Sequence, residues 1–150
     1  MKNERTLVLI KPDAMMKRLA GNIINDLYNL NLKMIGLKLV NVKKELAEKH
    51  YAEHKGKHFY EECIKYLTGE LHNNENVIAI VYQGENAIKK IREAIGKTNP
   101  DECEAFHIRG KYGKINSKTK CNENVLHASD SPENGEREIN LWFSKEELVE

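Results

Sequence analysis

The order of strand-like and helix-like segments constrains the fold of this chain more than any other feature of its sequence. Four segments are predicted to be strands: residues 6–10, 34–42, 77–82 and 124–128. The run at 77–82 is unbroken, apolar and rich in β-branched residues, which is typical of a strand buried on both faces. The second segment alternates instead, so we expect Ile35, Leu37 and Leu39 to share one side of a strand.

Helical spacing fills the intervals between these strands. Apolar residues recur three and four positions apart, which predicts helices over residues 19–30, 44–67 and 86–96 and a further one that begins near 131. Gly56 should divide the second of these into two helices. Capping residues are expected at Asn86, Ser131 and Ser144 (N-termini) and at Gly96 (a C-terminus). Residues 97–123 show little periodicity, and we expect a long polar loop there.

The resulting order, β-α-β-α-α-β-α-β-α, indicates the fold class. Two βαβ-like halves around an antiparallel sheet are typical of the ferredoxin-like α+β sandwich, in which helices pack on a four-stranded sheet. A chain of 150 residues can bury a sufficient core without disulfides or metal. We therefore expect residues 1–150 to form a single domain.

Composition and charge exclude several classes of protein. Lys plus Arg is 24 and Asp plus Glu is 23, so the net charge of 24 − 23 = +1 argues against a dedicated nucleic-acid-binding protein. No apolar run is long enough to span a bilayer, and the N-terminus lacks the apolar region of a signal peptide. The three cysteines are scattered, which disfavours a disulfide framework or a zinc ribbon. We expect a cytoplasmic protein with no membrane association.

Two familiar motifs fail on inspection. Gly96-Lys97-Thr98 looks like the end of a Walker A loop, but Ile91 occupies the position where that loop needs its first glycine. His50, His54 and His58 recur every four residues, and a continuous helix would place them on one face as potential metal ligands. Gly56 interrupts that helix and no carboxylate or cysteine completes the set, so we expect no metal held by protein ligands.

The segment from Asn124 to Ser131 carries the strongest chemical signal. His127 ends an apolar strand and is followed by small hydroxyl residues, so its imidazole should be accessible. One ring nitrogen could attack phosphorus while an acceptor holds the other, although the same pattern also suits a structural histidine. Lys11, Arg92 and Arg109 could supply the positive charge that phosphoryl transfer needs. Taken singly, each of these cations could equally be a solvated surface charge.

Five blocks of residues give this signal a family context. In chain order they are Glu4-Arg5-Thr6, Ile10-Lys11-Pro12-Asp13, Thr98-Asn99-Pro100, Ile108-Arg109-Gly110, and Asn124-x-x-His127-x-Ser129-Asp130-Ser131 continuing to Glu138-Ile139-x-Leu141-Trp142-Phe143. Together they resemble the nucleoside diphosphate kinase family over nearly the whole chain. The Asn-x-x-His-x-Ser-Asp-Ser block is highly specific to that family.

The resemblance implies a ping-pong enzyme in which His127 takes the γ-phosphate of a nucleoside triphosphate, mainly ATP, and passes it to a nucleoside diphosphate. Glu138 and Ser129 would orient the imidazole. The implied phosphate-holding residues are Lys11, Tyr51, Arg92, Thr98 and Arg109. Lys11 and Asn124 would also reach the ribose hydroxyl, and Phe59 would stack on the base.

Further consequences of the resemblance concern cofactor, substrate range and assembly. Mg²⁺ would arrive on the nucleotide phosphates rather than in a protein cage. A site that only stacks on the base should accept many nucleotides and so maintain nucleotide pools, because every base offers an aromatic face. Self-association is implied, with a hexamer as the usual assembly and a tetramer or dimer as alternatives.

The chain also departs from the family pattern. Ala14 follows Lys11-Pro12-Asp13 where the family has glycine, and Phe106-His107 replaces the usual Gly-Thr. The stretches at residues 68–76 and 111–123 are longer than in the family. Two other functions remain open on sequence alone: a kinase-like module that binds nucleotide or single-stranded nucleic acid without turnover, and a histidine phosphotransfer protein. The second would need a helical bundle, which the strand pattern disfavours.

Overall fold

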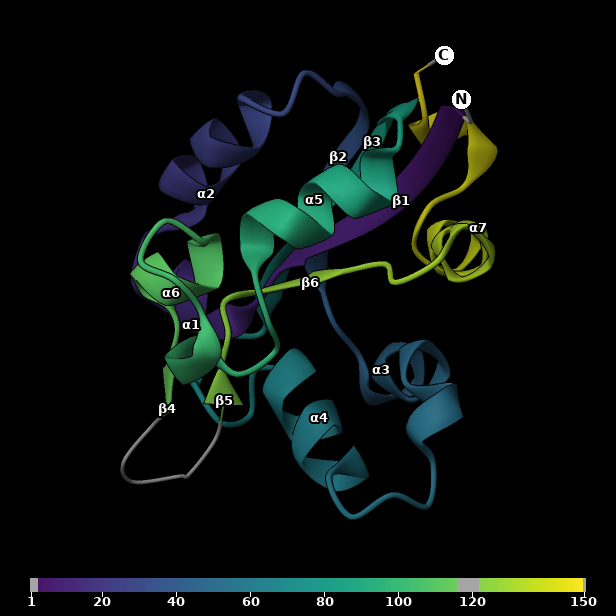
Figure 1. The fold of residues 1–150 in the computed structure, drawn as a ribbon. Coiled ribbons are helices and arrows are strands. Elements are labelled where there is room, and N and C mark those ends of the chain that lie inside the picture. The colour runs from purple at the N-terminus through teal and green to yellow at the C-terminus, as the bar shows by residue number, and fades with distance from the viewer. Residues whose placement is uncertain (1–2, 116–121, 150) are drawn as a thin grey trace.

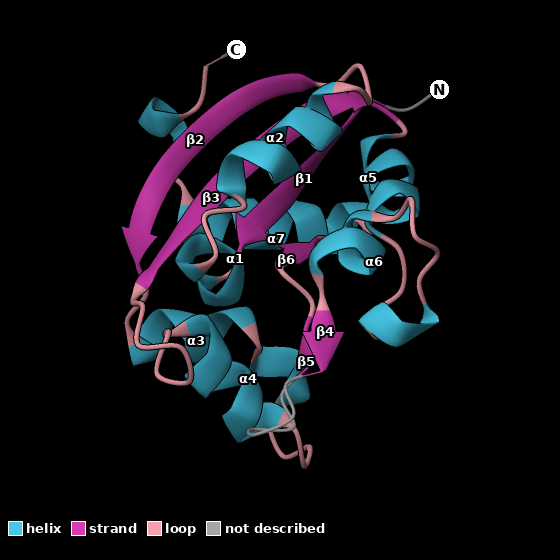
Figure 2. Ribbon diagram, turned by 90° about the vertical axis from the view of Figure 1, so that its left-hand side faces the viewer, coloured by secondary structure: helices cyan, strands magenta, loops and turns pink. Residues whose placement is uncertain are grey.

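A four-stranded antiparallel sheet organises the protein and confirms the expected ferredoxin-like α+β architecture. The computed structural model describes residues 3–115 and 122–149. The sheet has the strand order β2-β3-β1-β6 (Figure 1, Figure 2). Its strands are β1 (Asn3–Ile10), β2 (Lys33–Asn41), β3 (Asn76–Glu85) and β6 (Leu126–Ala128). β1 and β3 lie in the centre and are covered on both faces, which explains their nearly continuous apolar sequences.

Helices cover one face of the sheet above Val8, Ile10 and Ile80. They are α1 (Pro12–Met16), α2 (Ala20–Tyr28), α5 (Ala87–Ile95) and α6 (Ile108–Tyr112). The regular spacing of Ile91 and Ile95 puts both side chains in this core, where neither is exposed to solvent.

The opposite face packs against a second set of helices. They are α3 (Lys44–His50), α4 (Tyr60–Leu67) and α7 (Pro132–Trp142). Leu7 and Leu9 of β1 point to this side, where they meet Ile139 and Trp142 of α7. Below the sheet in Figure 2, α4 lies between α3 and a small antiparallel pair formed by β4 (Lys114–Ile115) and β5 (Asn122–Glu123). Short 3₁₀ helices occur at η1 (Ala52–His54), η2 (Pro100–Glu102) and η3 (Lys145–Glu147).

The caps of the helices follow the sequence with one exception. The Ser131 hydroxyl accepts a hydrogen bond from the Asn134 N–H at 3.1 Å, and the Glu147 carboxylate accepts one from the Ser144 N–H at 2.9 Å. Asn86 does begin α5, but its side chain makes no cap. The carboxylate of Glu4, on the neighbouring strand β1, instead accepts a hydrogen bond from the Ile88 N–H at 3.3 Å.

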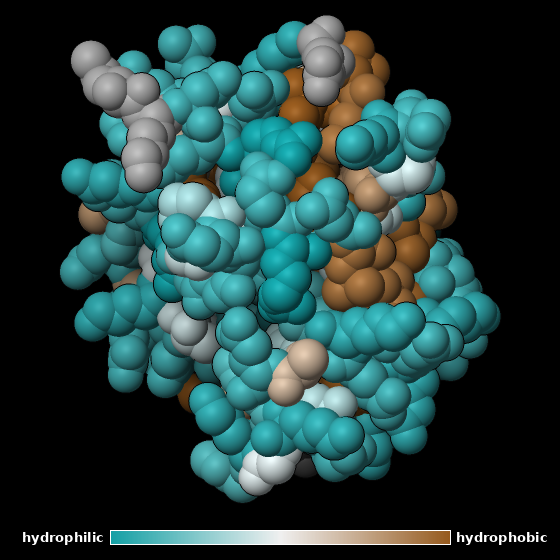
Figure 3. Space-filling model, turned by 90° about the vertical axis from the view of Figure 1, so that its right-hand side faces the viewer, coloured by the Kyte–Doolittle hydropathy of each residue, from teal (hydrophilic) through white to brown (hydrophobic). Residues whose placement is uncertain are grey.

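The expected alternation along β2 is wrong. Ile35 is buried, whereas Leu37 and Leu39 are 53% and 62% exposed. A bulge between Met34 and Gly36 shifts the register against β3, so residues on the two sides of it no longer share one face. Both exposed leucines lie on β2, which is an edge strand of the sheet. Figure 3 shows that hydrophobic surface gathers along one flank of the molecule.

The long polar stretch at 97–123 contains more structure than the sequence predicts. It holds η2, α6 and the β4–β5 pair, none of which is long enough to show apolar periodicity. Residues 116–121 of the stretch lie outside the described residues. Within the described parts of the chain, none of the helices has both the length and the apolar character needed to cross a membrane.

Close packing of α7 on β1 gives a test of this arrangement. A Cβ added at Gly135 would lie 2.7 Å from the backbone oxygen of Arg5, so Gly135→Ala must push α7 away from the sheet. We expect the free energy of unfolding to fall by about 1–3 kcal/mol, measured by urea denaturation. Gly21→Ala is the matched control, because nothing lies within 4 Å of its added Cβ, and it should stabilise α2 by about 0.5–1 kcal/mol. Equal effects at both positions would contradict the close contact.

Candidate active site

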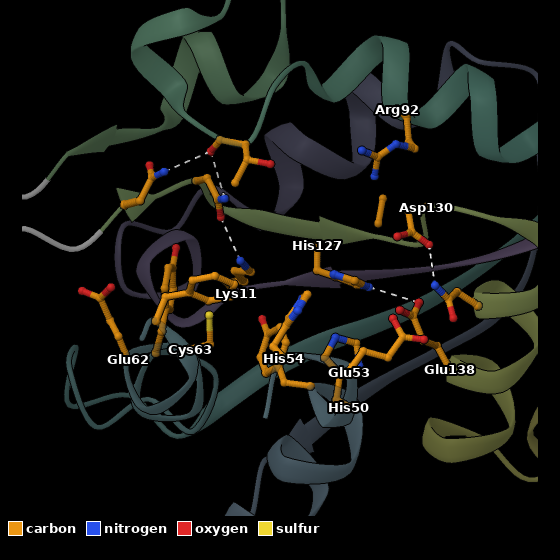
Figure 4. Close-up of a pocket in the computed structure, with 18 of the residues that line it drawn as sticks. Lys11, His50, Glu53, His54, Glu62, Cys63, Arg92, His127, Asp130 and Glu138 are labelled. Carbon is orange, nitrogen blue, oxygen red and sulfur yellow. Dashed lines mark hydrogen bonds and ion pairs between the residues drawn. The ribbon is translucent and has the colours of Figure 1, made fainter. Parts of the chain in front are cut away.

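A cavity of about 540 Å³ opens where β1 ends, and it gathers almost all of the predicted site residues (Figure 4). The predicted residues that line it are Lys11, Tyr51, Phe59, Arg92, Thr98, Arg109, Asn124, His127 and Glu138. Ser129 is fully buried behind Glu138 rather than in the cavity wall. The stretches that contribute these residues are far apart in sequence, so the cavity depends on the fold.

Pairing of β1 with β6 brings the first cation and the histidine together. Leu9 lies opposite His127 in the ladder, and the Lys11 N–H donates to the Val125 carbonyl at 2.8 Å. The pairing therefore brings Lys11 and His127 to the same end of the sheet.

A strained turn precedes the histidine. Val125 has a φ of 61°, which is unfavourable for a β-branched side chain, and the Leu126 N–H bonds back to the Asn124 carbonyl at 2.7 Å. Such a conformation persists only where surrounding contacts over-determine it, and here the bond from Lys11 to Val125 does so. The turn aims the Asn124 side chain toward Lys11.

His127 is oriented by a carboxylate. Its Nε2 lies 3.1 Å from Glu138 Oε2, and the Ser129 hydroxyl donates to the same oxygen at 2.6 Å. Burial alone would raise the pKa of Glu138, but the nearby His127 and the hydrogen bonds from His127 and Ser129 outweigh it, so the pKa lies below its usual value. An ionised Glu138 can only accept, so His127 donates from Nε2 and carries its lone pair on Nδ1.

A second histidine supports the first, and sequence reasoning considered it only as a metal ligand. The His50 ring packs edge to face against His127 with centroids 4.5 Å apart, and its Nδ1 accepts a hydrogen bond from Trp142 Nε1 at 3.1 Å. Burial, followed by the nearby His127 and Lys11, lowers the pKa of His50 well below its usual value. His50 is therefore neutral at pH 7.

Lys11 lines the cavity, and contacts with Asn124 and Tyr66 hold its side chain in place. Its Nζ donates to Asn124 Oδ1 at 2.8 Å and lies 4.7 Å above the ring of Tyr66. Asn124 Nδ2 in turn donates to the Thr98 carbonyl at 3.1 Å. These contacts link the end of β1 to the segment after α5.

Arg109 combines a structural and an electrostatic role. Its guanidinium donates to the carbonyls of Leu126, Asn124 and Gly96 at 2.8, 3.3 and 3.3 Å. Burial, together with the nearby Arg92, lowers the pKa of Arg109 to about 10, so the group remains charged at pH 7. Arg92 on α5 lies across the cavity from His127 (Figure 4). The two arginines make the cavity attractive to anions.

Aromatic rings form the wall below the cations. Tyr51 packs edge to face against His50 at 4.7 Å, and the His54 ring stacks near Tyr51 at 5.9 Å. The edge of His54 also meets Phe59 at 5.3 Å. Phe59 is partly buried and lines the cavity.

The histidines at four-residue spacing do not form a metal site together, because α3 ends at His50. Among the described residues, the one group with metal-ligand geometry is His50, His127 and Glu138, whose ligand atoms lie within 4.8 Å of one another. Lys11 lies close enough to lower the pKa of His50, and this positive charge disfavours a cation there.

Comparison with known proteins identifies this constellation. A sequence model described as "Nucleoside diphosphate kinase" matches residues 4–148. The chain belongs to the nucleoside diphosphate kinase family. The family member from Thermococcus kodakarensis is 46% identical over 147 residues, which cover 98% of this chain and 80% of that protein. The family member from Methanocaldococcus jannaschii is 42% identical over 147 residues, which cover 98% of this chain and 98% of that protein.

Solved structures of nucleoside diphosphate kinases share the whole fold. The Aquifex aeolicus enzyme superposes with a TM-score of 0.88 at 34% identity, covering 99% of this chain and 100% of that one. The Halobacterium salinarum enzyme in complex with CDP also scores 0.88, at 35% identity over 99% and 93% of the two chains. The structure of the Borrelia burgdorferi enzyme is a transition-state mimic with bound vanadate and ADP. It superposes with a TM-score of 0.87 at 27% identity, covering 99% of this chain and 91% of that one. As a nucleoside diphosphate kinase, this chain is a nucleotide-binding phosphotransferase.

The depressed pKa of Glu138 predicts a pH-dependent contribution to stability. Its ionised form contributes fully above the unfolded-state pKa near 4.5, and this contribution is lost as the pH falls through the lower folded-state value. Glu138→Gln should therefore be less stable than the parent by about 1–3 kcal/mol at pH 7. The difference should shrink below about pH 4.5 when urea denaturation is repeated across pH. A difference that stays constant with pH would contradict an ionised Glu138.

Proposed function

We propose that this chain transfers the γ-phosphoryl group of a nucleoside triphosphate, mainly ATP, to a nucleoside diphosphate through a phosphohistidine on His127. The observation that carries the proposal is the hydrogen bond between His127 Nε2 and the ionised Glu138. It leaves the lone pair on Nδ1, and His127 lines the cavity. A neutral imidazole with one nitrogen held by an acceptor is suited to attack phosphorus with the other.

The transfer takes place in two half-reactions. The Nδ1 lone pair forms a bond to the γ-phosphorus while the bond from that phosphorus to the β,γ-bridging oxygen breaks, and the nucleoside diphosphate leaves with that oxygen. A terminal phosphate oxygen of the second nucleoside diphosphate then attacks the same phosphorus and returns Nδ1 to its lone-pair form. The proton stays on Nε2 throughout and remains hydrogen-bonded to Glu138, whose negative charge stabilises the positive charge of the phosphorylated ring.

The cations and hydroxyls around His127 support the assignment of phosphate contacts. Lys11, Arg92 and Arg109 offset the charge that spreads over the phosphoryl oxygens in the transition state. Thr98 and Tyr51 line the same cavity and can donate from their hydroxyls. Asn124, held against Lys11, is proposed to reach the ribose hydroxyl.

The base contact favours a broad substrate range. Phe59 presents a ring at the cavity, and stacking on an aromatic face contributes roughly 1–3 kcal/mol for any base. The structural neighbours hold CDP in one case and ADP in another, a pyrimidine and a purine nucleotide. We therefore propose low base specificity and a role in maintaining nucleotide pools.

The metal is proposed to be Mg²⁺ carried by the nucleotide phosphates. Mg²⁺ prefers oxygen ligands, whereas the one potential metal-ligand group among the described residues is mainly imidazole. The carboxylates of Glu53 and Asp130 line the cavity and can accept hydrogen bonds from metal-bound water. When bound, the ion would neutralise part of the phosphate charge alongside Lys11 and Arg92.

Self-association is proposed with the hexamer as the usual assembly and a tetramer or dimer as alternatives. The exposed Leu37 and Leu39 on edge strand β2 support it, because such strands are normally covered or blunted by charge. We also propose that residues 1–150 act as one domain in the cytoplasm.

The His127→Ala variant tests the function. Purified parent protein mixed with ATP, Mg²⁺ and GDP should form GTP, and the variant should lose at least about a thousandfold in rate because the nucleophile is gone. His58→Ala, at an exposed histidine, is the matched control and should retain the parent rate. Circular dichroism checks that each protein is folded. Transfer by His127→Ala at the parent rate would contradict the mechanism.

A further inference from the structure

A buried histidine–glutamate pair joins two stretches of the chain that lie far apart in sequence. His72 lies in the 68–76 stretch and Glu123 ends β5, in the stretch at 111–123. His72 Nε2 is 3.0 Å from Glu123 Oε1, and the two side chains are 4% and 1% exposed. A polar pair this deeply buried needs an explanation, because burying such groups is costly unless each is well partnered.

One side of the pair leads directly to the nucleotide-binding residues. Glu123 precedes Asn124 in the chain, so fixing the Glu123 side chain also fixes the backbone that carries Asn124. Asn124 accepts the hydrogen bond from Lys11 Nζ at 2.8 Å and donates to the Thr98 carbonyl at 3.1 Å.

The other side reaches the same lysine by a separate route. The His72 ring packs on Tyr66 with centroids 5.3 Å apart, and the Tyr66 hydroxyl donates to Asp13 Oδ1 at 2.6 Å. Lys11 Nζ lies 4.7 Å above the same Tyr66 ring. The pair is therefore connected to Lys11 on both sides. Glu123 is connected through the adjacent Asn124, which contacts Lys11, and His72 through the ring of Tyr66, which also contacts Lys11.

The tautomer of His72 decides which of its atoms donates to Glu123. Lys17 is a second basic group near the carboxylate, and its Nζ lies 3.8 Å away, beyond normal hydrogen-bond distance. His72 Nδ1 is buried without a hydrogen-bond partner among the described residues. A buried lone pair is easier to leave unpaired than a buried N–H, so the proton belongs on Nε2, where it is donated to Glu123.

We propose that His72 and Glu123 form a positioning pair for nucleotide binding, which holds Asn124 and Lys11 in place without touching the ligand. This inference rests on the proposed contacts of Lys11 and Asn124 with phosphate and ribose. It gives the 68–76 stretch a function, because that stretch contributes the residue that positions the sugar- and phosphate-binding side of the cavity. Because the base is not involved, the contribution is the same for every nucleotide.

Calorimetric titration with ADP and with GDP tests the pair. His72→Leu removes the N–H donor, so the Glu123 carboxylate loses the hydrogen bond from His72. We therefore expect the Kd of both nucleotides to rise about tenfold. His72→Gln keeps an N–H donor of similar reach and should bind within about twofold of the parent. Glu123→Leu should weaken binding as His72→Leu does, and the double variant should be no weaker than either single one, because both remove the same contact.

Controls separate positioning from general damage to the fold. Glu70→Gln changes an exposed charge in the same stretch and should leave both Kd values unchanged. Should His72→Leu fail to fold, His72→Asn serves instead, because its amide is too short to reach Glu123. A Kd for His72→Leu equal to that of the parent would overturn the inference. A His72→Gln variant that binds nucleotide as weakly as His72→Leu would also overturn it.

The parent protein distinguishes failure of this inference from failure of the proposed function. A parent that neither binds ADP nor forms GTP from ATP and GDP would refute the function and, with it, the basis of the inference. A parent that does both, with a His72→Leu variant that binds ADP equally well, would leave the function intact and refute the positioning pair alone. Weakening confined to one of the two nucleotides would also overturn it, because it would indicate a contact with the base.

Discussion

Pairing of β1 with the three-residue strand β6 is the constraint on which the site depends. It places His127 opposite Leu9 and, through the bond from Lys11 to Val125, sets the lysine beside the strained turn. Because residues 6–10 of β1 are fully buried between the two cores, any displacement of the site would disturb both cores. The geometry needed for phosphoryl transfer is thus built on a buried central strand.

Around this pairing, hydrogen bonds determine which atoms are available for chemistry. Glu138, supported by Ser129, fixes the proton of His127 on Nε2, and Trp142 fixes the tautomer of His50 beside it. The three carbonyls that bind Arg109 hold its charge at the base of the same turn. Charge is therefore placed in advance, so little reorganisation is needed when a phosphoryl group arrives.

Regular patterns in the sequence predicted much of the fold, and motif residues predicted most of the site. Ile91 and Ile95 lie where their spacing indicates. The alternation predicted along β2 failed because of the bulge between Met34 and Gly36, where Phe143 and Leu148 from the far end of the chain pack closely on Gly36. The five-residue helices α1 and α6 are too short to show a period. The contacts of His50 and His72 join residues 92 and 51 positions apart, which no local pattern can indicate.

The central claim is that His127 Nδ1 becomes phosphorylated because Nε2 is committed to Glu138. ³¹P NMR of the protein after reaction with ATP, with no diphosphate acceptor added, distinguishes phosphate on the two imidazole nitrogens. The account predicts one phosphate per chain, attached to Nδ1, and removed when GDP is added. Phosphate on Nε2, on another residue, or absent from a protein that still forms GTP would contradict it.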